Sequence, residues 1–421
     1  MKKYYPRIVD QQIRTLQKSI GAIVVNGPKA CGKTESCKHA AMTIHSFSTE
    51  NEIDLYSINP KQALIGNPPI LIDEWQNIPS VWDEIRDDIN DSQEYGKYLL
   101  TGSVNTESET YHSGIGRFAG LKMYPMSLFE SKDSSGEVSI QDLFDNPGKD
   151  VFYKDSEKTL DDVAFFLCRG GWPLAVINPD KEASLRYPYA YLNGVIKLKS
   201  RKKENYFPRP LVAQYLFRSY ARNISTESSL TTIRKDLVQA GELKAIDDET
   251  FSSYLAKANE LYVIEDMMAW MPNLRSKTGI RSTPTRHFVD PSLAVAALEL
   301  TPEMLMHDLN LFGLLFEDLA VRDLRIYTPL YAPEVKHYRN YLDEEVDAIL
   351  FGNHDSWAPV EIKLGGKERT AEAIESLRKF RDSLDDTFQR KPSFMMVLTA
   401  IGPTFKTNDN IYVVPITRLK N

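Results

Sequence analysis

The sequence predicts an α/β fold whose N-terminal part is built on a parallel sheet. Over the first 150 residues, short apolar runs alternate with helix-sized segments. Several of these runs have no polar face, which is typical of parallel strands that helices cover on both sides. The first run, residues 21–26, leads into a glycine-containing turn and then into a helical pattern. This order is the strand–loop–helix unit of such sheets.

Length and composition narrow the class of protein. The 421 residues include 42% hydrophobic and 26% charged side chains, and they carry a net charge of −7 and three cysteines. Such values indicate a globular chain of roughly two to four domains. The start lacks the apolar stretch of a secretory signal, and no apolar run approaches roughly 18 residues, so no membrane span is expected. The few cysteines fit a reduced cytoplasm, and the acidic balance leaves room only for a local basic site.

The N-terminal elements follow in order. Helical spacing of apolar side chains predicts helices at residues 1–20, 34–45 and 80–89. Apolar runs predict strands at residues 21–26, 53–58, 69–73, 97–101 and 121–123. Residues 131–158 are polar and contain Gly136 and Pro147, so we expect a linker there.

The turn after the first strand, GPKACGKT, matches the phosphate-loop pattern GxxxxGK[ST]. Gly27 and Gly32 allow the backbone to wrap a polyphosphate with its N–H groups inward, and the next helix directs its positive end at the anion. Lys33 supplies a cation to the β- and γ-phosphates, and Thr34 offers its hydroxyl to Mg²⁺. The expected nucleotide-binding residues are Gly27, Pro28, Lys29, Ala30, Cys31, Gly32, Lys33 and Thr34.

A second strand, residues 70–72, ends in the acids Asp73 and Glu74. Asp73 is expected to hold the water shell of Mg²⁺ beside Thr34. Glu74 is placed to polarise a water for in-line attack on the γ-phosphate. Lys33 and Glu74 are therefore candidate catalytic residues, with ATP and Mg²⁺ as cofactors.

Two further positions complete the expected ATP site. Residues 98–103 (YLLTGS) form a strand that ends in small polar side chains, and either Thr101 or Ser103 is expected to sense the γ-phosphate. Arg117 lies in the glycine-containing stretch GIGRF. It is expected to stabilise the transition state of its own chain or of a neighbouring copy in a homo-oligomer.

The remainder predicts a helical region and then a second α/β region. Helix-sized segments at residues 212–222, 230–240 and 248–261, followed by strand-like residues 261–270, have the layout of a winged helix. Farther along, helices are predicted at residues 311–327 and 370–382, and strands at residues 344–351, 357–364, 394–399 and 410–414.

The stretches GPKACGKT, ILIDEWQNIP, KYLLTGS and SGIGRFAGLKMYPMSLFES together resemble one prokaryotic family of AAA-type (AAA+ superfamily) ATPases. These proteins carry a C-terminal domain of unknown function, DUF4143. The motifs GGWP, FVDPSL and LFEDL extend the resemblance over nearly the whole chain. Trp172 and Ser292 depart from the family, which often has a smaller residue and Gly at those positions.

The resemblance implies ATP binding and hydrolysis and a division into three domains. Residues 1–150 would form an AAA-like P-loop ATPase domain, residues 151–288 a helical and winged-helix-like domain, and residues 289–421 a restriction-endonuclease-like domain.

The C-terminal strands carry a second group of charged residues. Asp347 precedes the sequence EIK at 361–363 by 14 positions, and this pattern resembles the core of the PD-(D/E)xK nucleases. Carboxylates on adjacent strands can hold Mg²⁺ at a scissile phosphate, and strand alternation puts Glu361 and Lys363 on one face. Lys363 is expected to orient the attacking water and to stabilise developing charge. The resemblance adds Glu317, on the preceding helix, as a metal ligand.

Nucleic-acid contact is expected to come from a local basic strip. The third helix of the winged-helix candidate is not basic, because Asp248, Glu249 and Glu260 outnumber Lys257. The densest basic run, residues 197–203 (KLKSRKK), is the better candidate for phosphate contacts.

Two interpretations of function stay open. In the first, a cytoplasmic Mg²⁺-dependent ATPase controls an attached nuclease-like domain that acts on, or binds, DNA or RNA. In the second, the protein is an ATP-gated binding module whose C-terminal domain recruits a protein or DNA partner without cleavage. Metal-dependent cleavage of nucleic acid separates the two.

Overall fold

The computed structural model describes residues 4–102, 114–154, 157–199, 206–240, 246–271, 282–384 and 391–421. The chain forms two compact units. The N-terminal unit comprises Met1–Pro125 with Ala258–Val263, and the C-terminal unit comprises Met126–Lys257 with Ile264–Asn421. Among the described residues, no helix combines the length and the apolar character that a membrane span requires.

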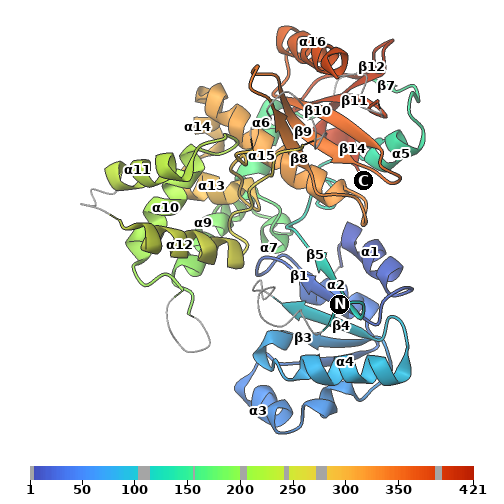
Figure 1. The fold of residues 1–421 in the computed structure, drawn as a ribbon. Helices are drawn as coiled ribbons and strands as arrows, with labels where there is room; N and C mark the ends of the chain where they lie inside the picture. The colour runs from blue at the N-terminus through green and yellow to red at the C-terminus, as the bar shows by residue number, and fades with distance from the viewer. Residues whose placement is uncertain are drawn as a thin grey trace. The chain divides into compact units, whose positions relative to one another are not determined.

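The N-terminal unit is a parallel sheet between helices, as predicted (Figure 1). All strand pairs are parallel, in the order β2-β3-β4-β1-β5. The strands are β1 (Ala22–Asn26), β2 (Thr43–Ser46), β3 (Ile70–Asp73), β4 (Tyr98–Gly102) and β5 (Phe118–Lys122). The helices are α1 (Ile8–Leu16), α2 (Lys33–Ala40), α3 (Glu50–Ile58) and α4 (Val81–Ser92), with the 3₁₀ turns η1 (Pro60–Leu64) and η2 (Trp75–Asn77).

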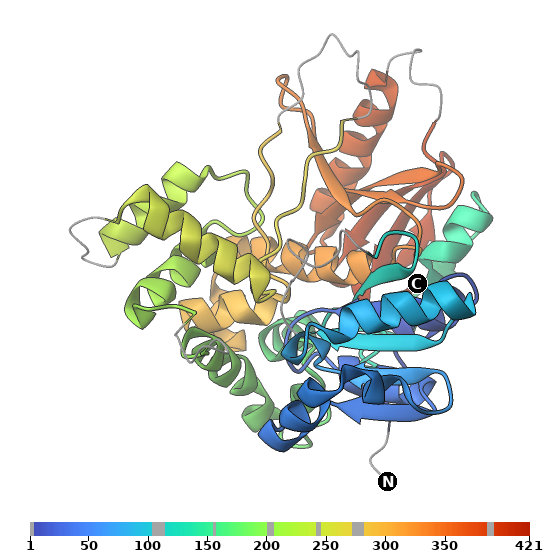
Figure 2. The same ribbon diagram turned by 60° about the horizontal axis from the view of Figure 1, so that its bottom comes forward.

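The buried strands explain why the sheet needs cover on both faces. Every residue of β1, β3 and β4 is buried. One face packs its alternate side chains, among them Val24 and Leu100, against the α4 residues Trp82 and Ile85, while α2 contacts β1, β3 and β4 (Figure 2). This double cover accounts for apolar runs without a polar face.

The prediction of a strand at residues 53–58 is wrong. Those residues belong to α3, which begins at a capping box: the Thr49 side chain accepts from the Glu52 N–H, and the Glu52 carboxylate accepts from the Thr49 N–H. The strand beside β3 is instead β2, which lies in the part of the sequence predicted as helix up to residue 45. Helix α2 ends earlier, at Ala40, and Ala41 is already extended.

The C-terminal unit contains a mixed seven-stranded sheet in the order β7-β12-β13-β11-β10-β9-β8. Its centre, β10, β11 and β13, is parallel, and the outer pairs are antiparallel. Helix α16 (Lys367–Ser383) packs on β10 and β11 (Figure 1). The strands are β7 (Phe152–Tyr153), β8 (Lys336–Arg339), β9 (Glu345–Phe351), β10 (Trp357–Lys363), β11 (Met395–Thr399), β12 (Thr404–Lys406) and β13 (Ile411–Pro415). The four strands predicted from residue 344 onward are therefore confirmed, as is the helix predicted between the second and the third of them.

Most of the other helices of this unit lie beside the sheet (Figure 1), and one of them, Leu309–Tyr327, contacts β9 and β10. They are α6 (Leu160–Arg169), α7 (Pro173–Val176), α8 (Lys181–Leu185), α9 (Tyr187–Ile196), α10 (Pro210–Arg222), α11 (Leu230–Ala240), α12 (Asp248–Glu260), α13 (Pro291–Leu298), α14 (Pro302–His307) and α15 (Leu309–Tyr327). Within the part of the chain that the structure describes, the strand-like residues 261–270 pair through isolated bridges. These are antiparallel at Ile264 with Phe288 and at Met267 with Thr285, and parallel at Ala269 with His337. The helices at α10, α11 and α12 are confirmed, and the winged-helix assignment stays a prediction.

Residues 131–158 are not a linker. They supply β6 (Val138–Ser139), α5 (Ile140–Asp145) and β7. Strand β6 pairs with β14 (Leu419–Lys420), beyond the turn η4 (Ile416–Arg418), and β7 pairs with β12. The first unit accordingly ends at Pro125 rather than near residue 150, because the polar stretch completes the edge of a sheet formed by the end of the chain.

A buried charge network lies at the centre of the C-terminal unit. Arg322 on α15 is 1% exposed. Its guanidinium donates to Asp290 at 2.8 Å and to Asp323 at 2.6 and 2.9 Å. Asp323 also accepts from the Leu128 N–H at 3.0 Å, and Asp290 from the Gly171 N–H at 2.9 Å. Buried charges persist only when they are paired and hydrogen-bonded, and these are.

The two departures from the family pattern contact each other in this network. The Trp172 indole N–H donates to the Ser292 hydroxyl at 3.1 Å, and that hydroxyl donates to Asp290 at 2.6 Å. Trp172 is fully buried and stacks on Tyr191 at 4.0 Å between ring centroids. A buried indole N–H needs an acceptor, so the larger side chain at 172 is matched by the hydroxyl at 292.

Replacing Arg322 tests the network. We expect Arg322→Ala to lower the free energy of unfolding by about 3 to 5 kcal/mol, because Asp290 and Asp323 are left as unpaired buried charges. Urea unfolding followed by circular dichroism measures the change. The matched control is Arg369→Ala, an exposed position, for which a change within about 0.5 kcal/mol is expected. Equal effects of the two substitutions would contradict the role of Arg322.

Candidate functional site

The phosphate loop, residues 27–34, joins β1 to α2. Gly27 has φ +151°, and a Cβ there would lie 2.1 Å from the Met123 carbonyl oxygen. Gly32, the N-cap of α2, has φ +113°, and Ala30 has φ +60°. The positive φ values at Gly27 and Gly32 are the ones that favour glycine. The pattern GxxxxGK[ST] therefore corresponds to a loop that only glycine at these two positions allows.

Lys33 lies inside this loop. It is 5% exposed, and its ammonium donates to the carbonyl oxygens of Gly27 and Pro28, each at 2.8 Å. Neutral carbonyls hold the cation without cancelling its charge, so the ammonium is available to an anion that enters the loop.

The polar side chains at the strand ends meet beside the loop. The Thr34 hydroxyl donates to Asp73 Oδ1 at 2.7 Å, and the Thr101 hydroxyl donates to the same oxygen at 2.5 Å. This convergence follows from the strand order, because β4 lies between β1 and β3 and pairs Thr101 with both Val25 and Asp73. Ligands of open α/β sheets bind at this carboxyl edge. Hydroxyl and carboxylate oxygens are also the donors that Mg²⁺ takes, so the residues fit that ion.

Glu74 follows in the left-handed conformation, with φ +58°. Its N–H donates to the Thr101 hydroxyl at 3.2 Å. Its carboxylate accepts from the Gln76 side-chain amide at 2.5 Å. Sequence reasoning missed Gln76, although it lies within the family-specific stretch DEWQNIP, two residues after the acid.

Two other predicted residues remain to be placed. Ser103 lies outside the described residues. Arg117 precedes β5, where Phe118 pairs with Ala22 at the start of β1, whereas the phosphate loop follows the end of β1. Its guanidinium donates to Asn90 and to the Ile115 carbonyl. Arg117 therefore lies at the amino end of these parallel strands, whereas the phosphate loop of the same chain lies at their carboxyl end. Action of Arg117 on a neighbouring chain stays a prediction.

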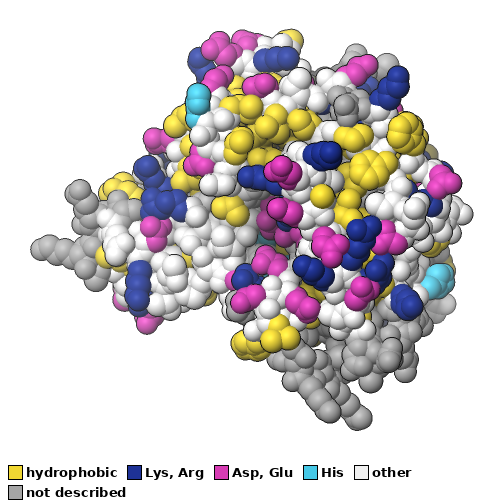
Figure 3. Space-filling model, turned by 90° about the horizontal axis from the view of Figure 1, so that it is seen from above, with side chains coloured by type: hydrophobic (Ala, Val, Ile, Leu, Met, Phe, Trp, Pro, Cys, Tyr) yellow, Lys and Arg dark blue, Asp and Glu magenta, His cyan; other side chains and the backbone are white. Residues whose placement is uncertain are grey.

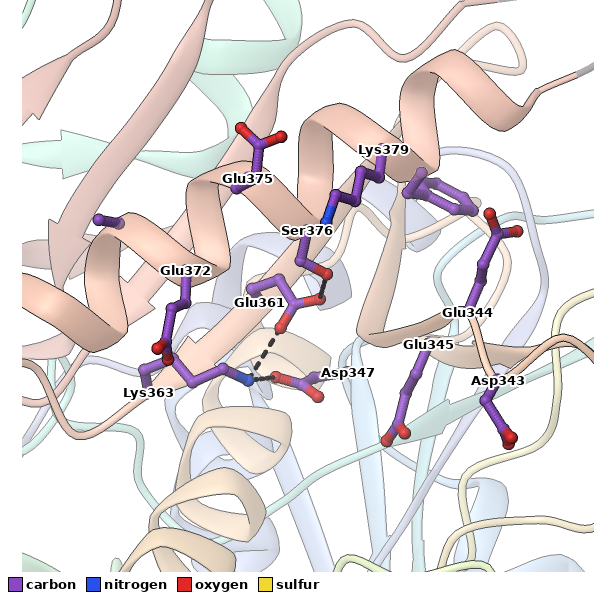
Figure 4. A pocket seen from close by; sticks show the side chains of 12 residues that line it. Asp343, Glu344, Glu345, Asp347, Glu361, Lys363, Glu372, Glu375, Ser376 and Lys379 are labelled. Atoms are coloured by element: carbon purple, nitrogen blue, oxygen red, sulfur yellow. Dashed lines mark hydrogen bonds and ion pairs between the residues drawn. The ribbon is translucent and has the colours of Figure 1, made fainter.

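A second group of charged residues lies in the C-terminal unit (Figure 4). Lys363 on β10 lies between two carboxylates, 2.9 Å from Asp347 Oδ2 on β9 and 2.8 Å from Glu361 Oε2. Asp347 also accepts from the Ile362 N–H at 2.6 Å, and Glu361 from the Ser376 hydroxyl at 3.0 Å. The structure brings the predicted acids and lysine together, and α16 adds Ser376, which the sequence did not indicate.

Burial and mutual repulsion change the proton affinity of these groups. Burial, with the charge of Asp347, raises the pKa of Glu361 to about 8. Burial also raises the pKa of Glu317 well above its usual range, and Asp347 adds to that rise. Burial lowers the pKa of Lys363, but the two carboxylates outweigh it and the net pKa is raised. Glu317 lies on α15, which contacts β9 and β10, but it is not among the residues that line the cavity beside the group.

The cavity beside this group has a volume of about 770 Å³. Its charged lining comprises seven acids and two lysines: Asp343, Glu344, Glu345, Asp347, Glu361, Glu372, Glu375, Lys363 and Lys379. Within the described residues, no three His, Cys, Asp or Glu side chains are arranged to hold a metal ion. Asp347 and Glu361 alone suit Mg²⁺, which binds one or two carboxylates and keeps its waters, provided that the Lys363 ammonium gives way.

The predicted basic strip is only partly described. Lys197 and Lys199 follow the end of α9, and residues 200–203 lie outside the described residues. The face in Figure 3 mixes Lys and Arg with Asp and Glu side chains. Contact with nucleic acid through this strip stays a prediction.

Three family models match consecutive parts of the chain. Residues 19–132 match a family model described as an AAA domain, residues 160–304 match a domain of unknown function (DUF8612), and residues 312–419 match a domain of unknown function (DUF4143). None of the curated proteins matches the chain. Among solved structures, the ORC2 protein of Aeropyrum pernix, described as ADPNP–ADP complexes, is similar at 10% identity and a TM-score of 0.30, over 63% of this chain and 90% of its own.

The raised pKa of Glu361 makes stability depend on pH. Its pKa rises from 4.5 to about 8 on folding. Between these values the folded state keeps a proton that the unfolded chain has lost, so this contribution favours the fold near pH 5 and is lost as the pH rises to about 8. We expect Lys363→Met to steepen this loss, because the acids then face each other without a cation.

Thermal unfolding midpoints between pH 5 and pH 9, in the presence of a chelator, measure the effect. Lys379→Met, an exposed lysine on the same cavity, should follow the wild-type pH profile. A Lys363→Met profile parallel to that of the wild type would contradict the charge balance described.

Proposed function

Because the chain joins an AAA-type P-loop domain to a C-terminal DUF4143 domain, we propose that it is a Mg²⁺-dependent ATPase whose nucleotide state controls the acidic site of its C-terminal unit. The observation that carries the ATPase part is the convergence of Thr34 and Thr101 on Asp73 beside the phosphate loop.

The loop supplies the binding energy for the polyphosphate. Its backbone N–H groups and the amino end of α2 attract the anion. Lys33 exchanges the carbonyls of Gly27 and Pro28 for phosphate oxygens, gaining a charge-assisted contact. Mg²⁺, when bound, would neutralise charge on the β- and γ-phosphates, and Thr34 and Asp73 are the residues that would hold it and its water.

Glu74 is the proposed general base. Its N–H bond to Thr101 fixes the backbone next to the strand end, and Gln76 orients the carboxylate through the side-chain amide. Glu74 then accepts a proton from the attacking water, while Thr101 stays close enough to Asp73 to respond to the γ-phosphate. This division leaves Asp73 for the metal and Glu74 for the proton.

Substitutions at Lys33 and Glu74 separate binding from hydrolysis. We expect Lys33→Ala to abolish ATP binding, because the loop loses the buried ammonium that would contact the β- and γ-phosphates. Glu74→Gln should bind ATP normally and hydrolyse it roughly 100-fold or more slowly, the usual contribution of a general base. Calorimetric titration with ATP and phosphate release measure the two properties. Unchanged hydrolysis in both variants would refute the assignment.

For the C-terminal site we propose metal-dependent cleavage of a nucleic-acid phosphodiester. The supporting observation is that Lys363 contacts both Asp347 and Glu361, which allows one ammonium to orient a water and to stabilise charge on a phosphate. Because seven acids line the cavity, a phosphodiester is repelled there until cations neutralise them. The alternative, recruitment of a partner without cleavage, is favoured by that same acidity and would fit a basic protein surface.

Cleavage assays decide between these functions. Wild-type protein should cut plasmid DNA or RNA in Mg²⁺, with a rate that changes between ATP and ADP, and a chelator should stop it. Lys363→Ala should lose roughly 100-fold or more in rate, whereas Lys379→Ala on the same cavity should keep cutting. If the wild type cuts neither substrate with ATP, with ADP or without nucleotide, the binding module is the correct function.

A further inference from the structure

Arg7 lies before α1 and outside the residues that match the AAA family model. Its side chain is nevertheless buried, with 8% of the residue exposed. One guanidinium nitrogen donates to the Cys31 carbonyl in the phosphate loop at 2.8 Å. The other donates to the Tyr124 carbonyl, just after β5, also at 2.8 Å. One side chain thus joins the start of the chain, the nucleotide loop and the exit of the sheet.

The bond to Cys31 determines the direction of a loop N–H group. The carbonyl of Cys31 and the N–H of Gly32 belong to one planar trans peptide and point in opposite directions. By holding the carbonyl, Arg7 turns the Gly32 N–H away from itself and toward the interior of the loop. Gly32 is the N-cap of α2, so this N–H is among those that a bound phosphate would accept.

Arg7 is itself held in place. The backbone N–H of Arg7 donates to Asp10 Oδ2 at 2.9 Å, and the carboxylate of Asp10 also accepts from the Tyr4 hydroxyl at 2.7 Å. The Tyr4 hydroxyl lies 3.0 Å from Ser36 Oγ, and the Tyr4 ring stacks on His39 at 4.5 Å. Because Ser36 and His39 belong to α2, the helix that follows the loop also fixes the residue that orients it.

The second bond connects the loop to the route out of the N-terminal unit. Met123, next to Tyr124, donates to the Asn26 carbonyl at 2.8 Å, and its own carbonyl lies against Gly27. The N-terminal unit ends at Pro125, directly after Tyr124. A change at the Cys31 peptide therefore alters the partners of the last residues before the C-terminal unit.

We propose that Arg7 is a positioning residue of the nucleotide site, which orients the Gly32 peptide toward the phosphates of ATP and ties it to Tyr124. This inference rests on the proposed ATP binding. A merely structural Arg7 would contribute to folding and leave the affinity of the folded protein for ATP unchanged.

The experiment measures ATP affinity in full-length Arg7→Met, Arg7→Lys and Arg14→Ala proteins by calorimetry, below their unfolding temperatures. Methionine keeps the apolar stem and removes both donors, so ATP binding should weaken roughly 10- to 100-fold, the range for losing hydrogen bonds from a charged group. Lysine keeps the charge and should restore part of the affinity. Arg14 is exposed on the same helix and should behave as wild type.

Steady-state hydrolysis adds a readout that folding alone does not move. Arg7→Met should raise KM for ATP more than it lowers kcat, because Asp73 and Glu74 keep their contacts. If Arg7→Met binds ATP as tightly as the wild type, or if Arg7→Met and Arg7→Lys bind ATP equally weakly, the proposed role of Arg7 is wrong and the proposed ATPase function is unaffected. Absence of ATP binding by the wild type overturns both this role and the proposed function.

Discussion

The C-terminal unit depends on one buried guanidinium. Arg322 and the carboxylates of Asp290 and Asp323 are almost completely withdrawn from water, so none of the three is tolerable without the others. The acids also accept N–H groups from Leu128 and Gly171. The network therefore requires segments that lie far apart in the sequence to come together on α15, and with them it determines where α15 lies. Because α15 contacts β9 and β10, the strands that carry Asp347, Glu361 and Lys363 pack against a helix held by this network.

The network also reaches toward the nucleotide domain along the chain. Met123 contacts the phosphate loop, and Leu128 is bonded to Asp323. Only a few residues, with Pro125 among them, separate the two contacts. Because the connection between Met123 and Leu128 is so short, it cannot absorb a displacement of Met123 as a long flexible linker would. The proposed coupling between nucleotide state and the C-terminal site would therefore have only a short covalent route to follow.

The sequence predicted which side chains lie together better than it predicted some of the elements between them. The phosphate loop, Asp73 and the Asp347–Glu361–Lys363 group follow from residue type and spacing, and the structure brings each group together. Residues 53–58 were misassigned because Ile53, Leu55 and Ile58 suit a strand as well as a helix. The capping signal, Thr49 followed by Glu52, was present and decides for the helix.

Other features had no local signal. Strand β7 exists only because residues near position 405 pair with it, and pairing over such a distance leaves no pattern in two residues. Arg7 acts on backbone carbonyls, which every residue carries, so no partner side chain marks it. The two departures at Trp172 and Ser292 were visible in sequence, but their bond to each other was not.

The two lysines at the proposed sites differ in the charge of their hydrogen-bond partners. Lys33 is bonded to neutral carbonyls, so a phosphate that replaces them adds the full attraction between opposite charges. Lys363 is bonded to the side chains of Asp347 and Glu361, so a phosphate that approaches Lys363 competes with these acids and is repelled by the other acids of the cavity. The N-terminal site is therefore prepared for an anion without any other change. The C-terminal site must first accept a cation that offsets the acids of its cavity, and this requirement gives a physical reason why its proposed activity would need a separate signal.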